Sequence, residues 1–86
     1  MHEMSIAMEV CRIAEETVGR TALPQVTEIG VLVGRQSGVE LENLRFCLET
    51  LLEMPPFREA KPVFEWALGD DLRVTYLEVD DDGPPH

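Results

Sequence analysis

The sequence of 86 residues predicts one small α+β domain, in which two helices pack on one face of a three-stranded sheet. Two stretches carry apolar residues at intervals of three and four, which is typical of amphipathic helices. Three shorter stretches alternate apolar and polar residues, as strands with one buried face do. Along the chain the order is helix, strand, helix, strand, strand. An apolar content of 44% indicates a folded chain, and its length leaves no room for a second core.

The first helix is expected from Ser5 to Val18, because apolar and charged side chains occupy opposite sides of this stretch. The apolar side carries Ile6, Ala7, Val10, Cys11, Ile13 and Ala14. Gly19 is a suitable helix end, and residues 20–24 are expected to form a loop. The first strand follows from Val26 to Val33, with Ile29, Val31 and Val33 on one strongly apolar face.

The second helix is expected from Val39 to Glu53, with leucines on one side at Leu41, Leu44, Leu48 and Leu51. Ser37 and Glu40 are spaced as in a capping box, where a hydroxyl accepts an amide hydrogen bond and a carboxylate reaches back. Glu40 is therefore expected to cap this helix. The helix ends before Pro55, because a proline excludes helical geometry from the residue that precedes it.

The last two strands are expected at Val63 to Trp66 and at Leu72 to Val79. The residues between them, 67–71, are turn-rich and few enough for a β-hairpin. The acidic segment 80–86 is expected to be a solvated, disordered tail rather than a metal site.

Composition argues against several functional classes. With 17 acidic and 7 basic residues the formal net charge is −10, which repels phosphate backbones, so no nucleic-acid partner is expected. No apolar run approaches the roughly 18 residues of a membrane span, and the N-terminus lacks the pattern of a secretory signal, so a cytoplasmic protein without membrane contact is expected. Cys11 and Cys47 lie in apolar helical patterns and are interpreted as small buried hydrophobes.

The first three residues, Met1, His2 and Glu3, form the place where the sequence gathers metal-binding groups within one chelate. The α-amine, a backbone amide and the His2 imidazole can turn onto one cation, as can the carboxylate or amide nitrogen of Glu3. Nitrogen ligands in a plane suit Ni(II) or Cu(II) better than magnesium or calcium. A histidine at position two also arises by chance, and chain ends are normally disordered, but a packed first helix would hold this terminus near one surface.

Catalytic machinery is not visible in the sequence. It contains neither a phosphate-binding glycine loop nor a Ser, His and Asp set, and its histidines are His2 and His86, at the two ends. An enzyme is therefore not expected.

Five segments spread over nearly the entire chain carry the pattern of one known family. They are residues 1–5 (MHEMS), residues 29–34 (IGVLVG), residues 37–40 (SGVE), Leu44 with Phe46, and residues 69–74 (GDDLRV). Together they resemble the HypA/HybF nickel metallochaperones, which deliver nickel during maturation of [NiFe]-hydrogenases and, in some organisms, of urease.

That resemblance implies a specific site and specific partners. It implies that His2 holds Ni(II) with the Met1 amine and the backbone amides of His2 and Glu3. It places Glu40 at the position of the family's acidic residue after the first strand, as a ligand or as a group that orients the terminus. It also implies the GTPase HypB and the hydrogenase large subunit as partners.

One departure from the family is large. Its zinc ribbon, built on two C-x-x-C pairs, would lie between the last two strands, where this chain has only residues 67–71. Cys11 and Cys47 cannot replace it, because a structural zinc needs four ligands at close spacing. No zinc is expected, and residues 1–79 are interpreted as the nickel-binding domain with the ribbon missing. A natural zinc-less member or an engineered deletion would both give this sequence.

Two functions remain open at this stage. The chain is expected to be a nickel metallochaperone domain, or alternatively an interaction module that keeps the surface for HypB without transferring metal. The sequence does not set the strand order, and a short connection before the last strand leaves open a homodimer that exchanges this strand between chains.

Overall fold

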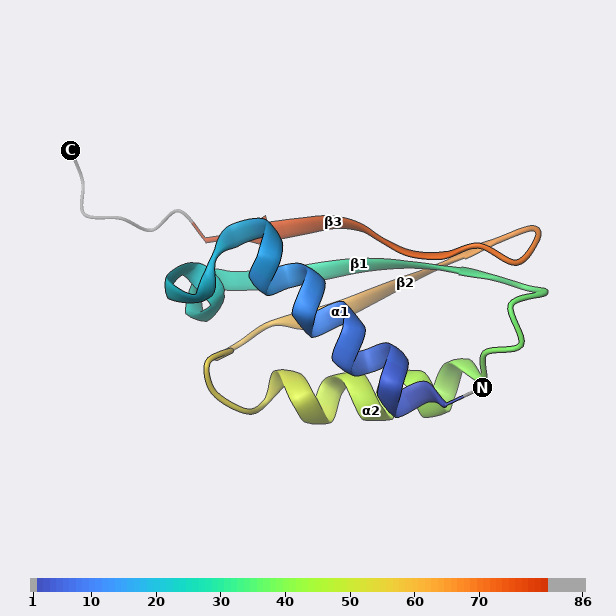
Figure 1. Ribbon diagram of the computed structural model, residues 1–86, viewed down its shortest axis with the longest axis horizontal. Helices are drawn as coiled ribbons and strands as arrows, with labels where there is room; N and C mark the ends of the chain where they lie inside the picture. The colour runs from blue at the N-terminus through green and yellow to red at the C-terminus, as the bar shows by residue number, and fades with distance from the viewer. Residues whose placement is uncertain (1, 81–86) are drawn as a thin grey trace.

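The computed structural model describes residues 2–80, which form an α+β domain as expected (Figure 1). The elements are α1 (Glu3–Val18), the 3₁₀ helix η1 (Arg20–Gln25), β1 (Val26–Gly34), α2 (Leu41–Leu52), β2 (Lys61–Ala67) and β3 (Leu72–Val79). Two differences from the sequence expectation concern the site. Helix α1 begins at Glu3 instead of Ser5, and α2 begins at Leu41 instead of Val39. The expected tail of residues 80–86 lies, apart from Asp80, outside the described residues.

Strand β1 is the centre of the sheet, whose order is β2-β1-β3. It pairs in parallel with β2 and antiparallel with β3. The expected hairpin between the last two strands is therefore wrong: β2 and β3 are consecutive in sequence, but β1 lies between them. A parallel pair requires a crossover connection, which here contains α2, and the chain then crosses the end of β1 to reach its other edge.

The crossing after β2 is held by the end of β1 itself. The backbone N–H of Gly34 donates to the Asp71 carbonyl at 2.6 Å, and that of Arg35 donates to the Ala67 carbonyl at 2.8 Å. The N–H of Gln36 donates to the Gly69 carbonyl at 2.8 Å. A Cβ atom on Gly34 would lie 2.4 Å from the Gly69 carbonyl oxygen, so only glycine fits where the crossing chain passes.

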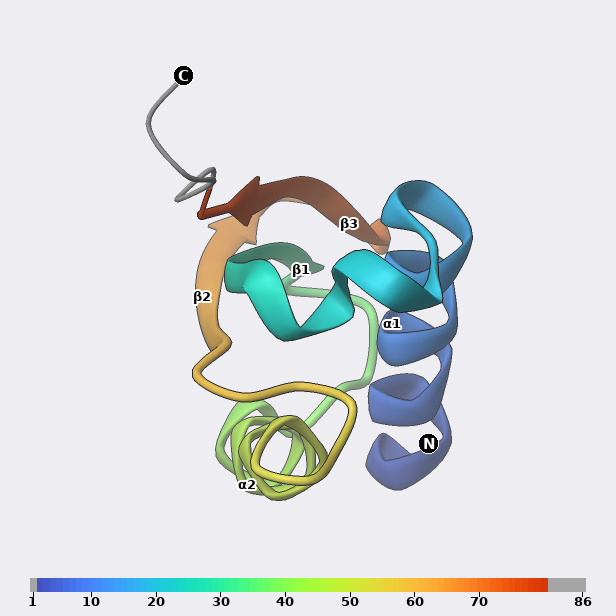
Figure 2. The ribbon, with the colours of Figure 1, turned by 90° about the vertical axis from the view of Figure 1, so that its left-hand side faces the viewer.

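Both helices pack on the same side of the sheet, and the core lies between them and β1 (Figure 2). Ile29, Val31 and Val33 are completely buried, which confirms the predicted inner face of β1. The helices and η1 contribute Ala7, Val10, Ala14, Leu23, Leu44, Cys47, Leu48 and Leu52. Burial of this apolar surface is the main force that holds α1 and α2 against the sheet.

The two cysteines are free thiols, and Cys47 is buried as expected. Cys11 is half-buried at the edge of the core. Loss of solvent raises the pKa of the Cys11 thiol to about 11, so it is protonated at neutral pH.

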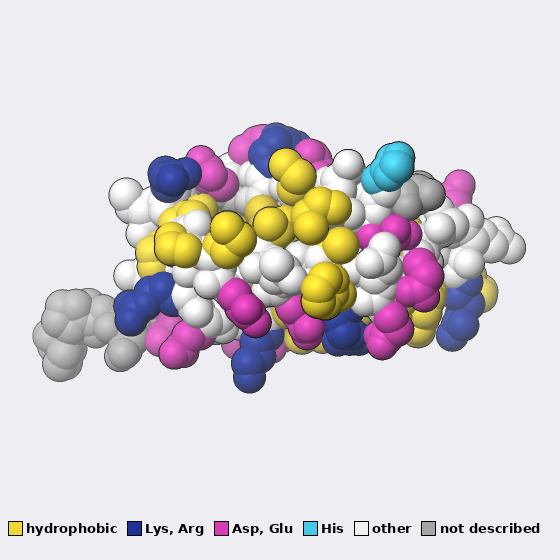
Figure 3. All heavy atoms as spheres, turned by 90° about the horizontal axis from the view of Figure 1, so that it is seen from below, with side chains coloured by type: hydrophobic (Ala, Val, Ile, Leu, Met, Phe, Trp, Pro, Cys, Tyr) yellow, Lys and Arg dark blue, Asp and Glu magenta, His cyan; other side chains and the backbone are white. Residues whose placement is uncertain are grey.

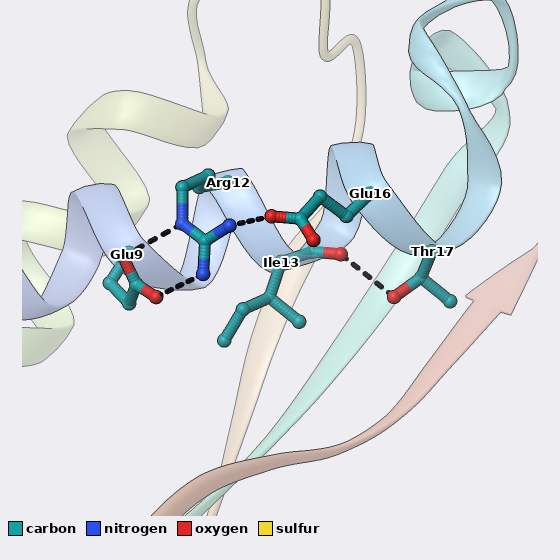
Figure 4. Close-up of polar contacts among 5 residues, drawn as sticks. All are labelled: Glu9, Arg12, Ile13, Glu16 and Thr17. Carbon is teal, nitrogen blue, oxygen red and sulfur yellow. Dashed lines mark hydrogen bonds and ion pairs between the residues drawn. The ribbon is translucent and has the colours of Figure 1, made fainter.

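The exposed side of α1 carries ion pairs at helical spacing (Figure 4). Arg12 pairs with Glu9 and with Glu16. The Thr17 hydroxyl donates to the Ile13 carbonyl at 2.7 Å. The neighbouring guanidinium lowers the pKa of the Glu9 carboxyl. These charges are solvated, so they stabilise the helix only slightly.

Apolar side chains are also exposed along the face formed by α1 and α2 (Figure 3). Met4, Met8, Phe46 and Met54 are between 42% and 68% exposed. No helix within residues 2–80 is both long enough and apolar enough to cross a membrane.

Candidate metal centre

The N-termini of α1 and α2 lie next to each other, and this brings Glu3 and Glu40, two of the four predicted site residues, into contact. His2 is the N-cap of α1 and Glu40 is the N-cap of α2, both with extended backbone geometry. The carbonyl of His2 accepts from the Ile6 N–H at 3.2 Å, as the first hydrogen bond of its helix. Met1 lies outside the described residues.

Glu3 connects the two helices. It is the first residue of α1 and only 8% exposed, and among residues 2–80 it is the one charged side chain that is buried. Its Oε2 accepts from the backbone N–H of Glu40 at 3.0 Å, and its Oε1 accepts from Nδ2 of Asn43 at 3.0 Å. A buried carboxylate is tolerated when hydrogen bonds replace its water, as they do here.

These hydrogen bonds also keep Glu3 ionised. The Glu40 N–H is the largest cause that lowers the pKa of the Glu3 carboxyl, followed by the backbone N–H of Glu3 itself. Desolvation raises this pKa, and the Asn43 amide lowers it again. The net shift is downward, so the carboxylate is negative at neutral pH.

Glu40 caps α2, but not as the predicted capping box. Its Oε1 accepts from the Asn43 N–H at 2.9 Å, so this carboxylate reaches forward into the helix rather than back. The Ser37 hydroxyl oxygen instead accepts from the Val39 N–H at 3.3 Å. The reason is Gly38, whose φ of +82° turns the chain and keeps residues 37–40 outside the helix.

Asn43 was not identified from the sequence, although it contacts both carboxylates. Its backbone N–H donates to Glu40 and its side-chain amide donates to Glu3. A signal was present: asparagine is unfavourable within helices unless its side chain finds local hydrogen bonds, and Asn43 stands in the first turn of α2. The partner of that side chain, 40 residues away, could not be read from local pattern.

The His2 side chain is exposed and makes no capping hydrogen bond within the described part of the chain. The amide groups of His2 and Glu3 precede the first intrahelical donor, so a ligand could use their nitrogens without breaking the α1 hydrogen-bond ladder. Between His2 and Asp80, no group of three or more His, Cys, Asp and Glu side chains converges as a metal site. A metal at this position would therefore depend mainly on backbone nitrogen and the imidazole.

Comparison with known proteins bears on this arrangement. The family model described as "HypA: Hydrogenase/urease nickel incorporation, metallochaperone, hypA" matches residues 1–69. The chain belongs to the HypA family. The matched part of HypA contains His2, Glu3 and Glu40 and ends before β3.

Several curated proteins named hydrogenase maturation factor HypA are similar to this chain. That of Chlorobaculum parvum is 42% identical over 65 residues, which cover 76% of this chain and 58% of the relative. That of Polaromonas naphthalenivorans is 35% identical over 69 residues, with 80% and 60% covered. That of Prosthecochloris aestuarii is 32% identical over 72 residues, with 84% and 64% covered. The matches thus span about 60% of the length of these HypA relatives.

The connection between β2 and β3 is short in this chain. The sequence has no C-x-x-C pair, and its 86 residues are consistent with a HypA chain that lacks the zinc ribbon. Residues 68–71 connect β2 to β3 directly by crossing the end of β1.

Proposed function

We propose that this chain is the nickel-binding domain of a HypA metallochaperone, which holds one Ni(II) at its N-terminus and delivers it during [NiFe]-hydrogenase maturation. The observation that carries the proposal is the connection between helix N-termini: Glu3 ties the start of α1 to the start of α2 within the part matched by the family. A terminus held in this way loses less conformational freedom when it chelates a metal than a free chain end would.

The ligands we propose are the Met1 amine, the imidazole of His2, and the backbone amide nitrogens of His2 and Glu3. These groups form fused chelate rings with nitrogen donors in one plane, which is a field that Ni(II) favours. Ligation by amide nitrogen requires its deprotonation, so binding should release protons. Because both oxygens of the Glu3 carboxylate accept hydrogen bonds, its amide nitrogen is the better placed ligand.

Glu40 has a supporting place in this proposal. Its carboxylate uses Oε1 for the cap of α2 and adds negative charge beside the terminus. The positive end of a helix macrodipole disfavours a cation, and carboxylates at both helix starts offset it. Glu40 can therefore remain a cap while it stabilises, or directly ligates, the bound ion.

Delivery requires contact with other proteins. By family resemblance we propose the GTPase HypB and the hydrogenase large subunit as partners, in the cytoplasm. The exposed methionines of the α1 and α2 face, of which Met4 stands closest in sequence to the site, support such a contact, because exposed apolar patches commonly mark interaction surfaces (Figure 3). A homodimer that exchanges β3 is a further prediction, which light scattering of the purified protein tests by mass.

Isothermal titration of untagged protein with Ni(II) tests the function. We expect one equivalent bound by the native sequence and no stoichiometric binding by His2→Ala, because the imidazole closes the chelate. His86→Ala is the matched control and should bind like the native sequence, since it removes the other histidine. Glu40→Ala should bind one equivalent more weakly, and a complete loss would make Glu40 an essential ligand.

The contradicting result is also clear. If His2→Ala bound one nickel with native affinity, the N-terminal site would be wrong. If the native protein bound none but was still captured by HypB with or without nickel, the chain would be an interaction module without metal transfer.

A further inference from the structure

We propose that Asn43 is the positioning residue of the nickel site: it holds the Glu3 carboxylate and so fixes the backbone that presents the ligands. The inference rests on the proposed function and extends it to a residue outside the predicted ligand set. Asn43 would not touch the ion and would act entirely through Glu3.

The hydrogen bonds form a closed ring that joins the two helix starts. Nδ2 of Asn43 donates to Glu3 Oε1 at 3.0 Å, and the Glu40 N–H donates to Glu3 Oε2 at 3.0 Å. Glu40 Oε1 in turn accepts from the Asn43 N–H at 2.9 Å. Each carboxylate is therefore held by Asn43, one by its side chain and the other by its backbone.

The ring determines which part of Glu3 is available to a metal. Both oxygens of its carboxylate accept hydrogen bonds from residues at the start of α2. We therefore expect that this carboxylate does not ligate the ion. The Glu3 amide remains at the first position of α1, directly after His2. When the Glu3 side chain is held in place, the backbone amides of His2 and Glu3, which we propose as ligands, are held in a fixed orientation as well.

The side chain of Asn43 is separable from general stability. The cap of α2 uses its backbone N–H, which every substitution except proline retains. Further along, α1 is held by the buried residues Ala7, Val10 and Ala14. Loss of the side-chain amide should therefore loosen the first turn of α1 and leave the rest of the domain folded.

The first test is nickel titration of Asn43→Ala. We expect one equivalent to bind with about tenfold weaker affinity, as is common when a group that orients a ligand is removed. The visible absorption of the Ni(II) complex should keep its shape, because the ligands themselves are unchanged. Thr50→Ala, which removes another hydrogen-bonding side chain of α2, is the matched control and should bind like the native protein.

A second test exchanges the amide and carboxylate groups between Asn43 and Glu3. Asn43→Asp places a carboxylate against Glu3 and should weaken nickel binding more than Asn43→Ala. Adding Glu3→Gln restores a complementary pair: the new glutamine carbonyl can accept from the Glu40 N–H, and its NH₂ can donate to the new aspartate. This double variant should recover affinity to within threefold of the native value, with the same absorption spectrum.

Each result separates the possibilities. If the double variant folds but does not recover affinity, the Glu3 carboxylate is itself a ligand and the inference is overturned. If the native protein binds nickel through His2 but Asn43→Ala binds within twofold of it, the inference fails while the proposed function stands. If the native protein binds no nickel, both fail. Circular dichroism of every variant shows whether it is folded. If Asn43→Ala does not fold, the nickel affinity of the isosteric double variant tests the inference instead.

Discussion

Replacement of Gly34 by alanine should destabilise the fold, because the added methyl group would meet backbone atoms of the crossing chain. The added Cβ would lie 2.4 Å from the Gly69 carbonyl oxygen and 2.7 Å from the Asp71 nitrogen, both backbone atoms that cannot rotate away. The crossing chain would have to move and lengthen its three hydrogen bonds to residues 34–36.

The magnitude follows from two contributions. Overpacking of a filled site costs about 1–3 kcal/mol, and each of the three backbone hydrogen bonds costs about 0.5–1.5 kcal/mol if it is lost, so Gly34→Ala should lower the free energy of unfolding by roughly 2.5–7.5 kcal/mol. A chain of 86 residues is stable by roughly 4–13 kcal/mol, so this variant should lose a large part of its stability at 25 °C.

Urea unfolding followed by circular dichroism measures this change, with Gly38→Ala as a matched control. Gly38 has a positive φ of +82°, which favours glycine, but a Cβ there would meet nothing within 4 Å. Its substitution should therefore cost only about 1–2 kcal/mol of backbone strain. Equal stability losses in the two variants, or a loss below about 1 kcal/mol for Gly34→Ala, would refute the role of the crossing.

Two predictions concern pH. Because the pKa of Glu3 is lowered, its contribution to stability is present above its ordinary pKa of 4.5 and is lost as the pH falls through the pKa of the folded state. Glu3→Gln should therefore make the free energy of unfolding, measured with urea, less dependent on pH at acid pH. Tyr76 donates to the Glu28 carboxylate, which raises the pKa of the phenol to about 12 from 10.0. Its contribution should therefore be complete below pH 10 and lost toward pH 12; ultraviolet titration of Glu28→Gln should show ionisation closer to 10, and an unchanged midpoint would disprove the interaction.

The helices and strands could be predicted because each buries a periodic set of side chains. The three inner residues of β1 and the leucines of α2 were identified in this way. The hairpin between β2 and β3 was wrong for a physical reason: turn residues indicate that the chain reverses, but not which strand it lies beside afterwards. Residues 68–71 do reverse the chain, and they carry it across β1 instead of alongside β2.

The nickel site itself stays a prediction from the sequence, and the structure adds one contact between two of its residues. His2, Glu3 and Glu40 were identified as one group, and the structure brings Glu3 and Glu40 into contact. The sequence did not predict that Glu3 is buried, since a carboxylate near a chain end is normally solvated. Its hydrogen bonds come from Glu40 and Asn43, which lie about 40 residues away, and a contact over this separation has no periodic pattern in the sequence.

The central position of β1 has a consequence for synthesis on the ribosome. This strand is made early, yet both of its pairing partners, β2 and β3, belong to the last third of the described chain. At about 5–20 residues per second, the segment from Gly34 to Val79 takes roughly 2–9 s to synthesise, and until β3 is complete this apolar strand has at least one open edge. Every residue inserted between β2 and β3 would postpone the arrival of the last strand. The direct crossing at residues 68–71 keeps this interval of exposure short.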